Sequence, residues 1–422
     1  MTDAVLRQTR AELAHWRLAA EALLDLDDAA APEAWAGLEA YLQCGIRDRL
    51  TAVASSVVHE ARALERRAAD GHDSDGVRRG VLALRRRYLQ VETIMDFYGD
   101  AIGSRTSPSL RALLRGFDVL AGDSMATTLA PLGITAPPAL VYVDKGLGAA
   151  ILRAGIRLWD EAHPSPAAAV KLTRHNLSYP TALLHETGHQ VGHQTGWNTE
   201  LAEQLRTVLE PRSADAAELW GSWAGEIAAD VHAFAQAGWA PVFALANVVD
   251  GPTPEVFRIR LGDPHPFAWV RVMFNVALCR SWFGHGPWDV VGQAWWHRHP
   301  LQSAPAQARE VARVSVEVIG DLVDVCTRRA FRAFRGAPLA GVLDPRKVSP
   351  DALRDLEQRA GGTLLTSSYL RRRHPVAILS ILSTRAVLDP GNAAEHRRVL
   401  AGWIRNLGAE AAPLQLPSPR VA

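Results

Sequence analysis

The sequence contains only three cysteines, Cys44, Cys279 and Cys326, and they are far apart in the chain. No two of them form a C-x-x-C pair, so the chain lacks the paired spacing of a disulfide framework or of a redox motif. Isolated cysteines of this kind are typical of reduced, mostly buried residues in a cytosolic protein. We therefore predict a cytoplasmic location.

Neither long apolar runs nor an excess of one charge is present. The chain has 46 basic and 45 acidic residues, a net charge of +1, which gives no footprint for nucleic acid or a membrane surface. The longest apolar stretches, around Trp239–Val249 and Pro375–Leu382, fall short of the roughly 18 residues of a membrane span. The start, Met1–Arg7, lacks the apolar core of a signal peptide. We expect no membrane span and no nucleic-acid partner.

Most of the chain has helical periodicity. Hydrophobic residues make up 48% of the sequence, which is ample for a large core. We predict an N-terminal helical region over residues 1–130, a central core over 131–300, a C-terminal helical region over 301–410 and a disordered tail over 411–422. In the first region, apolar residues recur at spacings of three and four: Leu38, Leu42, Ile46, Leu50, Val53 and Val57, then Val77, Val81, Leu84, Tyr88, Val91, Met95 and Tyr98.

Strands are predicted only near the start of the central core. Ala139–Val143 and Ala168–Thr173 have the β-branched and apolar composition of strands, and Gly155–Trp159 is a third candidate. Together they predict a small mixed sheet. The Val170 strand would offer its edge to an extended peptide by strand addition.

Helices are predicted after the sheet. The first would have Ser178 or Tyr179 as its cap, Pro180 in its first turn and a stop at Gly192 or Gly196. Later segments are predicted as single helices over Ala214–Ala237, Pro266–Phe283 and Trp288–His297, a long helix carrying Val311, Val314, Val318, Leu322 and Val325, and a linker over Gly336–Pro350.

The first of these helices contains the motif around which the chain is organised. Residues 183–193 read Leu-Leu-His-Glu-Thr-Gly-His-Gln-Val-Gly-His and include H-E-x-x-H. On a helix, His185 and His189 lie one turn apart, roughly 6 Å along the axis, so both imidazoles can reach one metal ion. Glu186 lies beside the same face, where it can take a proton from a water on that ion. The motif therefore predicts a zinc site.

A catalytic zinc site needs a third protein ligand and one position left open for water. The metzincin extension of the motif would place that ligand at Thr195, which is a poor zinc ligand. His193 lies two helical turns beyond His185, roughly 12 Å from its level. Solvent or outer contact is the better expectation for His193.

A third option is the segment Gly-Glu-Ile-Ala-Ala-Asp at residues 225–230. Glu226 and Asp230 are at i and i+4 on a later helix, so both side chains point the same way. Glu226 can ligate zinc while Asp230 accepts a hydrogen bond from the far nitrogen of a ligand histidine. We favour this option over an acidic pair on an ordinary helix surface.

H-E-x-x-H followed by E-x-x-A-D resembles the gluzincin metallopeptidases. His265–Arg271 reads H-P-x-x-x-x-R, which is similar to an element of the CAAX-prenyl-endopeptidase and HtpX-like enzymes. The resemblance covers roughly residues 139–283 and implies that His265 and Arg271 face the bound substrate carbonyl. Those relatives are commonly membrane-embedded, and this chain has no spanning segment. The resemblance therefore implies a soluble peptidase and does not imply prenylated substrates.

The fold expected from these observations is mainly α (α+β), with long N- and C-terminal helical regions around a zincin-like core and a small sheet. The expected activity is zinc-dependent hydrolysis of peptide bonds in a protein or peptide substrate. Two alternatives stay open: a non-proteolytic interaction protein with a structural or vestigial zinc, and a zinc hydrolase of a small amide. The expected site consists of Zn²⁺ ligands His185, His189 and Glu226, the outer residue Asp230, the general base Glu186, and His265 and Arg271 at the carbonyl.

Overall fold

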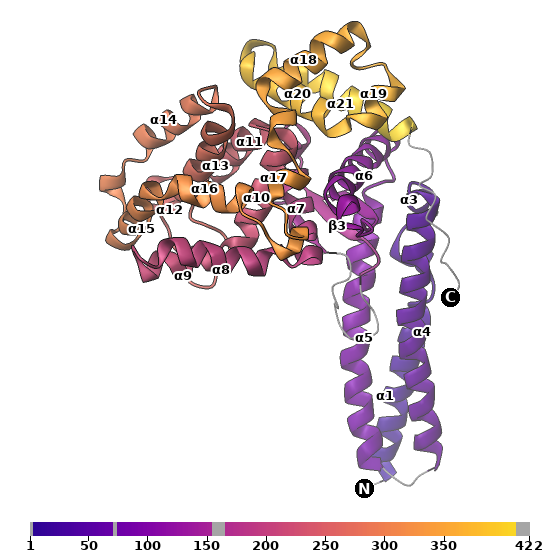
Figure 1. Cartoon of the computed structure of the whole chain (residues 1–422). Helices are drawn as coiled ribbons and strands as arrows, with labels where there is room; N and C mark the ends of the chain where they lie inside the picture. The colour runs from indigo at the N-terminus through magenta and orange to yellow at the C-terminus, as the bar shows by residue number, and fades with distance from the viewer. Residues whose placement is uncertain (1–2, 71–73, 154–164, 411–422) are drawn as a thin grey trace. The chain divides into compact units, whose positions relative to one another are not determined.

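The computed structural model describes residues 3–70, 74–153 and 165–410. The fold is mainly α with one three-stranded sheet, which confirms the predicted fold class (Figure 1). The chain forms two compact units; of the described residues, the first contains those up to Arg115 and 165–167, and the second contains Gly116–Arg153 and Ala168–Glu410. Residues 301–410 belong to the same unit as the sheet, and the predicted division at residues 130 and 300 stays a prediction. None of the helices in the described ranges is long and apolar enough to cross a membrane.

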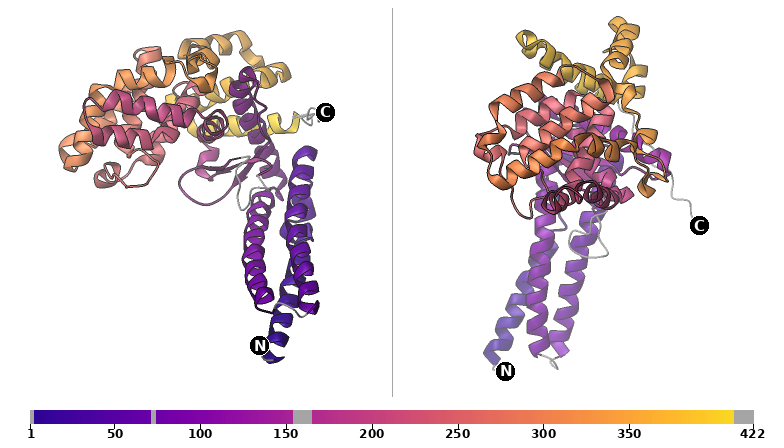
Figure 2. Two further views of the ribbon diagram at one scale, coloured as in Figure 1. Left: turned by 60° about the horizontal axis from the view of Figure 1, so that its bottom comes forward. Right: turned by 60° about the vertical axis from the view of Figure 1, so that its left-hand side comes forward.

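Three long helices that lie side by side dominate the first unit (Figures 1 and 2). The apolar series predicted for the second of them is buried, from Leu42 through Val57, because a spacing of three and four keeps these side chains on one helix face. The helices of this unit are α1 (Asp3–Ala22), the short α2 (Leu26–Ala29) and α3 (Pro32–Trp35), α4 (Ala40–Asp70), α5 (Ser74–Gly103) and the beginning of α6 (Pro108–Leu129).

The sheet belongs to the second unit. Its strands β1 (Ala139–Val143), β2 (Ala150–Leu152) and β3 (Ala168–Leu172) stand in the order β1-β3-β2, with β1 parallel and β2 antiparallel to β3. The prediction that the Val170 strand offers a free edge is wrong, because β3 is central and pairs on both sides. Within the described residues β1 and β2 are the two edge strands, and β2 is the more exposed of them. The predicted strand Gly155–Trp159 lies within residues 154–164, which are outside the described residues.

The helix α7 (Ala182–Thr195) carries the H-E-x-x-H motif. It starts after Thr181, not after the predicted caps Ser178 or Tyr179, and Thr181 makes no side-chain cap. It ends at Gly196, whose φ of 74° suits a residue without a Cβ. Gly192 is inside the helix, where a Cβ would come within 2.2 Å of the Asn198 side chain.

Two predicted long helices are each broken into two. The segment predicted as Ala214–Ala237 forms α9 (Ala214–Ser222) and α10 (Ala224–Ala237), which meet at buried Trp223. The second break is at buried Val318, between α15 (Ala306–Glu317) and α16 (Ile319–Arg328). The junction residues are Trp223 and Val318, so no glycine or proline marks either junction. The apolar periodicity of the sequence continues across both, and for this reason each segment is predicted as one helix. Both junction side chains are buried in the core of the second unit.

The rest of the second unit surrounds one aromatic-rich core. The predicted linker over residues 336–350 is part of this packing, since it buries Leu339 and Val348 and contains a short helix. The other helices are α8 (Trp197–Leu209), α11 (Ala240–Val249), α12 (Thr253–Val256), α13 (Ala268–Phe283), α14 (Trp288–Arg298), α17 (Leu339–Val342), α18 (Pro350–Ala360), α19 (Ser368–Arg373), α20 (Pro375–Leu388) and α21 (Ala393–Glu410).

Candidate metal centre

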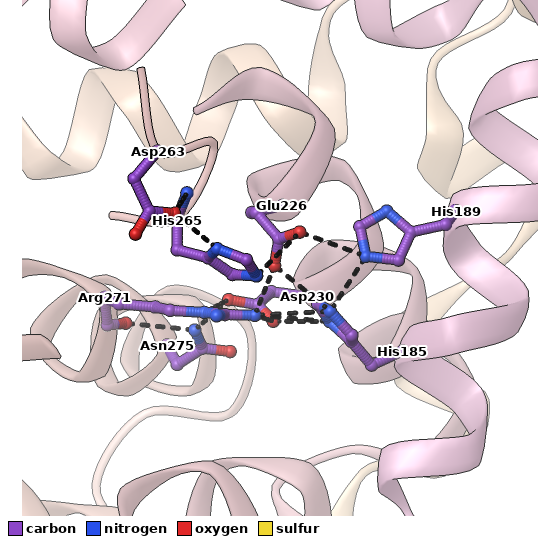
Figure 3. A network of polar contacts seen from close by, with 8 residues as sticks. All are labelled: His185, His189, Glu226, Asp230, Asp263, His265, Arg271 and Asn275. Carbon is purple, nitrogen blue, oxygen red and sulfur yellow. Dashed lines mark hydrogen bonds and ion pairs between the residues drawn. The ribbon is translucent and has the colours of Figure 1, made fainter. Parts of the chain in front are cut away.

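The three predicted ligands come together where α7 packs against α10 (Figure 3). The Nε2 atoms of His185 and His189 are 3.1 Å apart. The carboxylate of Glu226 lies against both, with Oε2 3.3 Å from His185 Nε2 and Oε1 3.2 Å from His189 Nε2. One ligand atom from each residue fits within 4.8 Å of the other two. The i, i+4 spacing on α7 therefore delivers two imidazoles to one carboxylate on α10.

This cluster has the properties of a divalent cation site. Two imidazole nitrogens and one carboxylate oxygen form a donor set that zinc accepts. Glu226 Oε2 is buried and accepts no hydrogen bond of normal geometry, although an Arg271 nitrogen lies 3.0 Å away. The Nε2 atoms of His185 and His189 point at each other, an arrangement that a cation between their lone pairs would stabilise. The residues present therefore fit zinc.

Asp230 holds His185 in the tautomer that a metal requires. Its Oδ1 atom accepts a hydrogen bond from His185 Nδ1 at 2.8 Å, so Nε2 is the ring nitrogen that faces Glu226 and that a metal would take. Asn275 Nδ2 donates to the other oxygen of Asp230 at 3.0 Å. These three residues, His185, Asp230 and Asn275, lie on α7, α10 and α13. The packing of these helices therefore determines the orientation of the His185 ring.

Arg271 lies behind the ligands. Its Nε and one terminal nitrogen donate to the two oxygens of Asp230, both at 2.8 Å, and only 8% of its side chain is exposed. Burial would raise the pKa of Asp230, but Arg271 and His185 hold that pKa well below its usual range. This geometry gives Arg271 a positioning role toward Asp230 and Glu226. The predicted contact with a substrate carbonyl stays a prediction.

The electrostatic balance of the cluster favours ionised carboxylates. Burial acts to raise the pKa of Glu226, and the two ligand histidines and Arg271 together hold it far below its usual range. Burial acts to lower the pKa of His185, while Asp230 and Glu226 raise it to about 10. Protons and a cation therefore compete for the same imidazole nitrogens.

Glu186 is next to the cluster and outside it. Its side chain is 5% exposed and lines the same cavity as the ligands. Burial raises the pKa of its carboxyl above the usual range. A carboxyl whose pKa is raised toward neutrality is suited to accept a proton and deliver it again.

His265 approaches Glu226 from the side opposite to the α7 histidines (Figure 3). Its Nε2 atom lies 3.5 Å from Glu226 Oε1, and its Nδ1 donates to Asp263 Oδ1 at 2.6 Å. Asp263 also accepts the backbone N–H of His265 at 3.0 Å, so the turn fixes both residues together. The sequence prediction missed this role of Asp263. The available signal was an acid two residues before a histidine in a proline turn.

Two other candidates for the third ligand are outside the cluster. Thr195 donates its hydroxyl to the carbonyl of Val191 at 2.8 Å. His193 is exposed, two turns from His185 on α7. The favoured option, Glu226, is the one that the structure brings to His185 and His189.

Two residues that the sequence prediction did not use bring α7 and α10 close together. A Cβ on Gly188 would lie 2.8 Å from the Cα of Ala229, so only glycine permits this approach without a shift. Buried His232 donates from Nδ1 to the carbonyl of Leu184 at 3.1 Å and accepts from Gln236 at 3.0 Å with Nε2. Both contacts hold α7 and α10, the helices that carry the three candidate ligands, at this separation.

A cavity of about 670 Å³ opens beside the cluster. Residues of β2, α7, α10 and α11 line it, together with the segment before α13 that carries His265.

Comparisons with family models, curated proteins and solved structures give no match for this chain. The function is therefore inferred from the residues of the site.

Proposed function

We propose that this protein is a zinc-dependent metallopeptidase that hydrolyses internal peptide bonds. The strongest support is that His185, His189 and Glu226 lie together at one point. Asp230 holds the His185 ring, and Glu186 lines the same cavity as these residues. When bound there, zinc would lower the pKa of a water molecule and polarise a carbonyl. This donor set leaves room for a further ligand, as a catalytic site requires.

Glu186 is the proton carrier in the proposed reaction. Its carboxylate accepts a proton from the attacking water and delivers it to the nitrogen of the leaving amine. The raised pKa of the buried carboxyl brings its proton affinity closer to that needed for both steps. Its position outside the ligand cluster leaves it free to move that proton.

His265 is the proposed donor to the carbonyl oxygen of the substrate. Its Nδ1 is committed to Asp263, so in the protonated ring Nε2–H is left to donate toward the cavity. A fixed donor stabilises negative charge that develops on that oxygen. Asp263 would keep the ring in this orientation.

The substrate is proposed to bind as an extended strand. β2 is antiparallel to β3 and its outer edge has no strand partner in the described part of the chain. Ala150 and Ile151 of β2 also line the cavity that contains the cluster. Backbone pairing with this edge would hold a protein or peptide substrate without selecting its side chains.

We also propose a cytoplasmic location, because the three cysteines are free thiols.

The test is metal content together with proteolysis. Purified protein is analysed for bound metal and incubated with denatured casein, with and without a chelator, beside a Glu186→Gln variant. We expect about one zinc per chain, cleavage that the chelator abolishes and zinc reconstitutes, and a variant that keeps zinc and loses cleavage. Bound zinc without hydrolysis of any substrate would favour the interaction protein. Hydrolysis of small amides alone would favour the amidohydrolase.

A further inference from the structure

The helix α11 is apolar on all sides. Its sequence, Ala-Pro-Val-Phe-Ala-Leu-Ala-Asn-Val-Val, contains no charged residue and a single polar one, Asn247. A helix that is hydrophobic all round is normally buried all round. One side meets this expectation, since Val242, Ala246 and Val249 pack against the core of the second unit.

A neighbouring side of α11 faces the cavity. Pro241, Ala244, Leu245 and Val248 have the spacing of one helix face, and all four line the cavity that contains Glu186. Ala244 is buried, whereas Pro241, Leu245 and Val248 are only partly buried and lie outside the core cluster of this unit. An uncharged face of four apolar side chains is thus present beside the candidate metal centre.

This face lies on the same cavity as the edge of β2. Ile151 on β2 and Leu245 on α11 both line it, with Glu186 and Glu226 among the other lining residues. A peptide in extended conformation projects successive side chains to opposite faces. The side chains of a substrate paired with β2 therefore point alternately to the two faces of the sheet. The apolar residues of α11 are available to one side chain that points into the cavity.

We propose that Pro241, Ala244, Leu245 and Val248 form a specificity subsite for an apolar side chain next to the cleaved bond. This proposal rests on the proposed peptidase function and names its substrate class, peptides with a large aliphatic or aromatic residue at that position. A charged side chain would lose its hydration against these four residues, and Asn247 is the one polar side chain that α11 brings to the cavity. Discrimination of roughly 10- to 100-fold in kcat/KM is expected from an apolar pocket of this kind.

The experiment uses quenched fluorescent peptides of one glycine- and serine-rich sequence with a single variable residue. That residue is leucine, phenylalanine, alanine, aspartate or lysine, and each peptide is assayed with the zinc-loaded full chain. Ala244→Phe fills the subsite, and Leu245→Lys places a cation in it. Val290→Asp is the matched control, because Val290 is 67% exposed on α14 and does not line the cavity.

We expect the wild type to prefer leucine or phenylalanine over aspartate by at least 10-fold in kcat/KM. Ala244→Phe should reduce cleavage of these two peptides toward the value of the alanine peptide, and Leu245→Lys should raise cleavage of the aspartate peptide relative to leucine. Val290→Asp should keep the wild-type preference. Unchanged preference in both α11 variants, with unfolding temperatures near that of the wild type, would overturn the subsite while the peptidase stands.

Binding separates this inference from the proposed function. Fluorescence anisotropy of labelled leucine and aspartate peptides is measured with the wild type and with both α11 variants. If no peptide is cleaved, the peptidase proposal fails. A wild-type preference for the leucine peptide that Ala244→Phe removes would still support the apolar subsite, and equal binding of both peptides would overturn it.

Discussion

The carboxylate of Asp230 lies 2.8 Å from the Nδ1 atom of His185, with the Arg271 guanidinium paired to both carboxylate oxygens. This relationship decides which nitrogen of His185 is free for a metal. The hydrogen bond keeps the proton on Nδ1, and the ion pair keeps Asp230 ionised. A surface acid at the same sequence position would do neither.

Substitution of Asp230 tests this arrangement. Asp230→Ala should lower the affinity for zinc by roughly 10- to 100-fold, because His185 loses its orienting partner and Arg271 is left buried beside Glu226. Affinity is measured by competition with a chromophoric chelator. Asp324→Asn is the control, because Asp324 pairs with Arg328 on the surface of α16 and should leave zinc affinity unchanged.

Glu226 is expected to be the third ligand. Glu226→Ala should abolish stoichiometric zinc, since it leaves two imidazoles and a buried arginine at the site. His193→Ala and Thr195→Ala should each retain about one zinc per chain, because both residues are outside the cluster. Metal analysis after gel filtration gives the answer. If His193→Ala loses the metal and Glu226→Ala keeps it, this assignment of the ligand set is wrong.

Gly188 should be intolerant of a side chain. Gly188→Ala places a Cβ 2.8 Å from the Cα of Ala229 and 3.1 Å from its carbonyl oxygen, so α7 and α10 must separate. Overpacking of this kind costs about 1–3 kcal/mol of unfolding free energy. Zinc affinity should also fall, because the ligands lie on both helices. The measurements are urea unfolding and chelator competition.

The control for Gly188 is Gly122→Ala on α6, where no described atom lies within 4 Å of the added Cβ. An alanine inside a helix is better than glycine by about 1 kcal/mol, so this variant should be slightly stabilised. Equal stability of the two variants would show that the close approach of α7 and α10 is not important for folding.

The ligand cluster could be predicted because helix geometry is local. The spacing of His185 and His189, and of Glu226 and Asp230, determines which side chains share a face before any tertiary contact exists. Helix ends with a strong local signal were also accessible, as at Gly196. The meeting of the two helices was inferred from the pairing of the motifs, and the structure brings them together.

Features determined by tertiary packing were missed. β2 has three residues, too few for a periodicity, and its pairing with β3 decides which edge is exposed. The break at Trp223 has no local signal because its cause is burial on the core. The orientation of Arg271 was also inaccessible, since a long side chain on α13 can reach either a substrate or the carboxylate of Asp230.

The stability of the protein should depend on pH through His232. Burial, with a smaller contribution from His185 and His189, lowers the pKa of His232 to about 4 from its usual 6.5. The neutral form is favoured by folding, so the contribution is fully present above pH 6.5 and is lost as the pH falls toward 4. The full loss is about 3 kcal/mol of unfolding free energy.

This dependence is measured by urea unfolding at pH 7.5 and pH 4.5 with a chelator present throughout. His232→Gln cannot take up the proton, so its stability should fall less between these two pH values than that of the wild type. At pH 7.5 the variant should be the less stable of the two, because the contact with the carbonyl of Leu184 is weakened. Identical pH dependence in both proteins would exclude His232 as the titrating group.

The kinetic role of His265 is testable on a folded, zinc-loaded background. His265→Ala should lower kcat by roughly 10²-fold or more with zinc content unchanged, because the ring donates only to the transition state and is not a ligand. Asp263→Asn should give a smaller loss, since the amide oxygen can still accept from Nδ1 and hold the ring in place. Zinc content and peptide kinetics are measured in parallel for both variants. The two residues are coupled through one hydrogen bond, so the double variant should be little worse than His265→Ala alone. Wild-type kcat in His265→Ala would reduce this pair to a structural turn before α13.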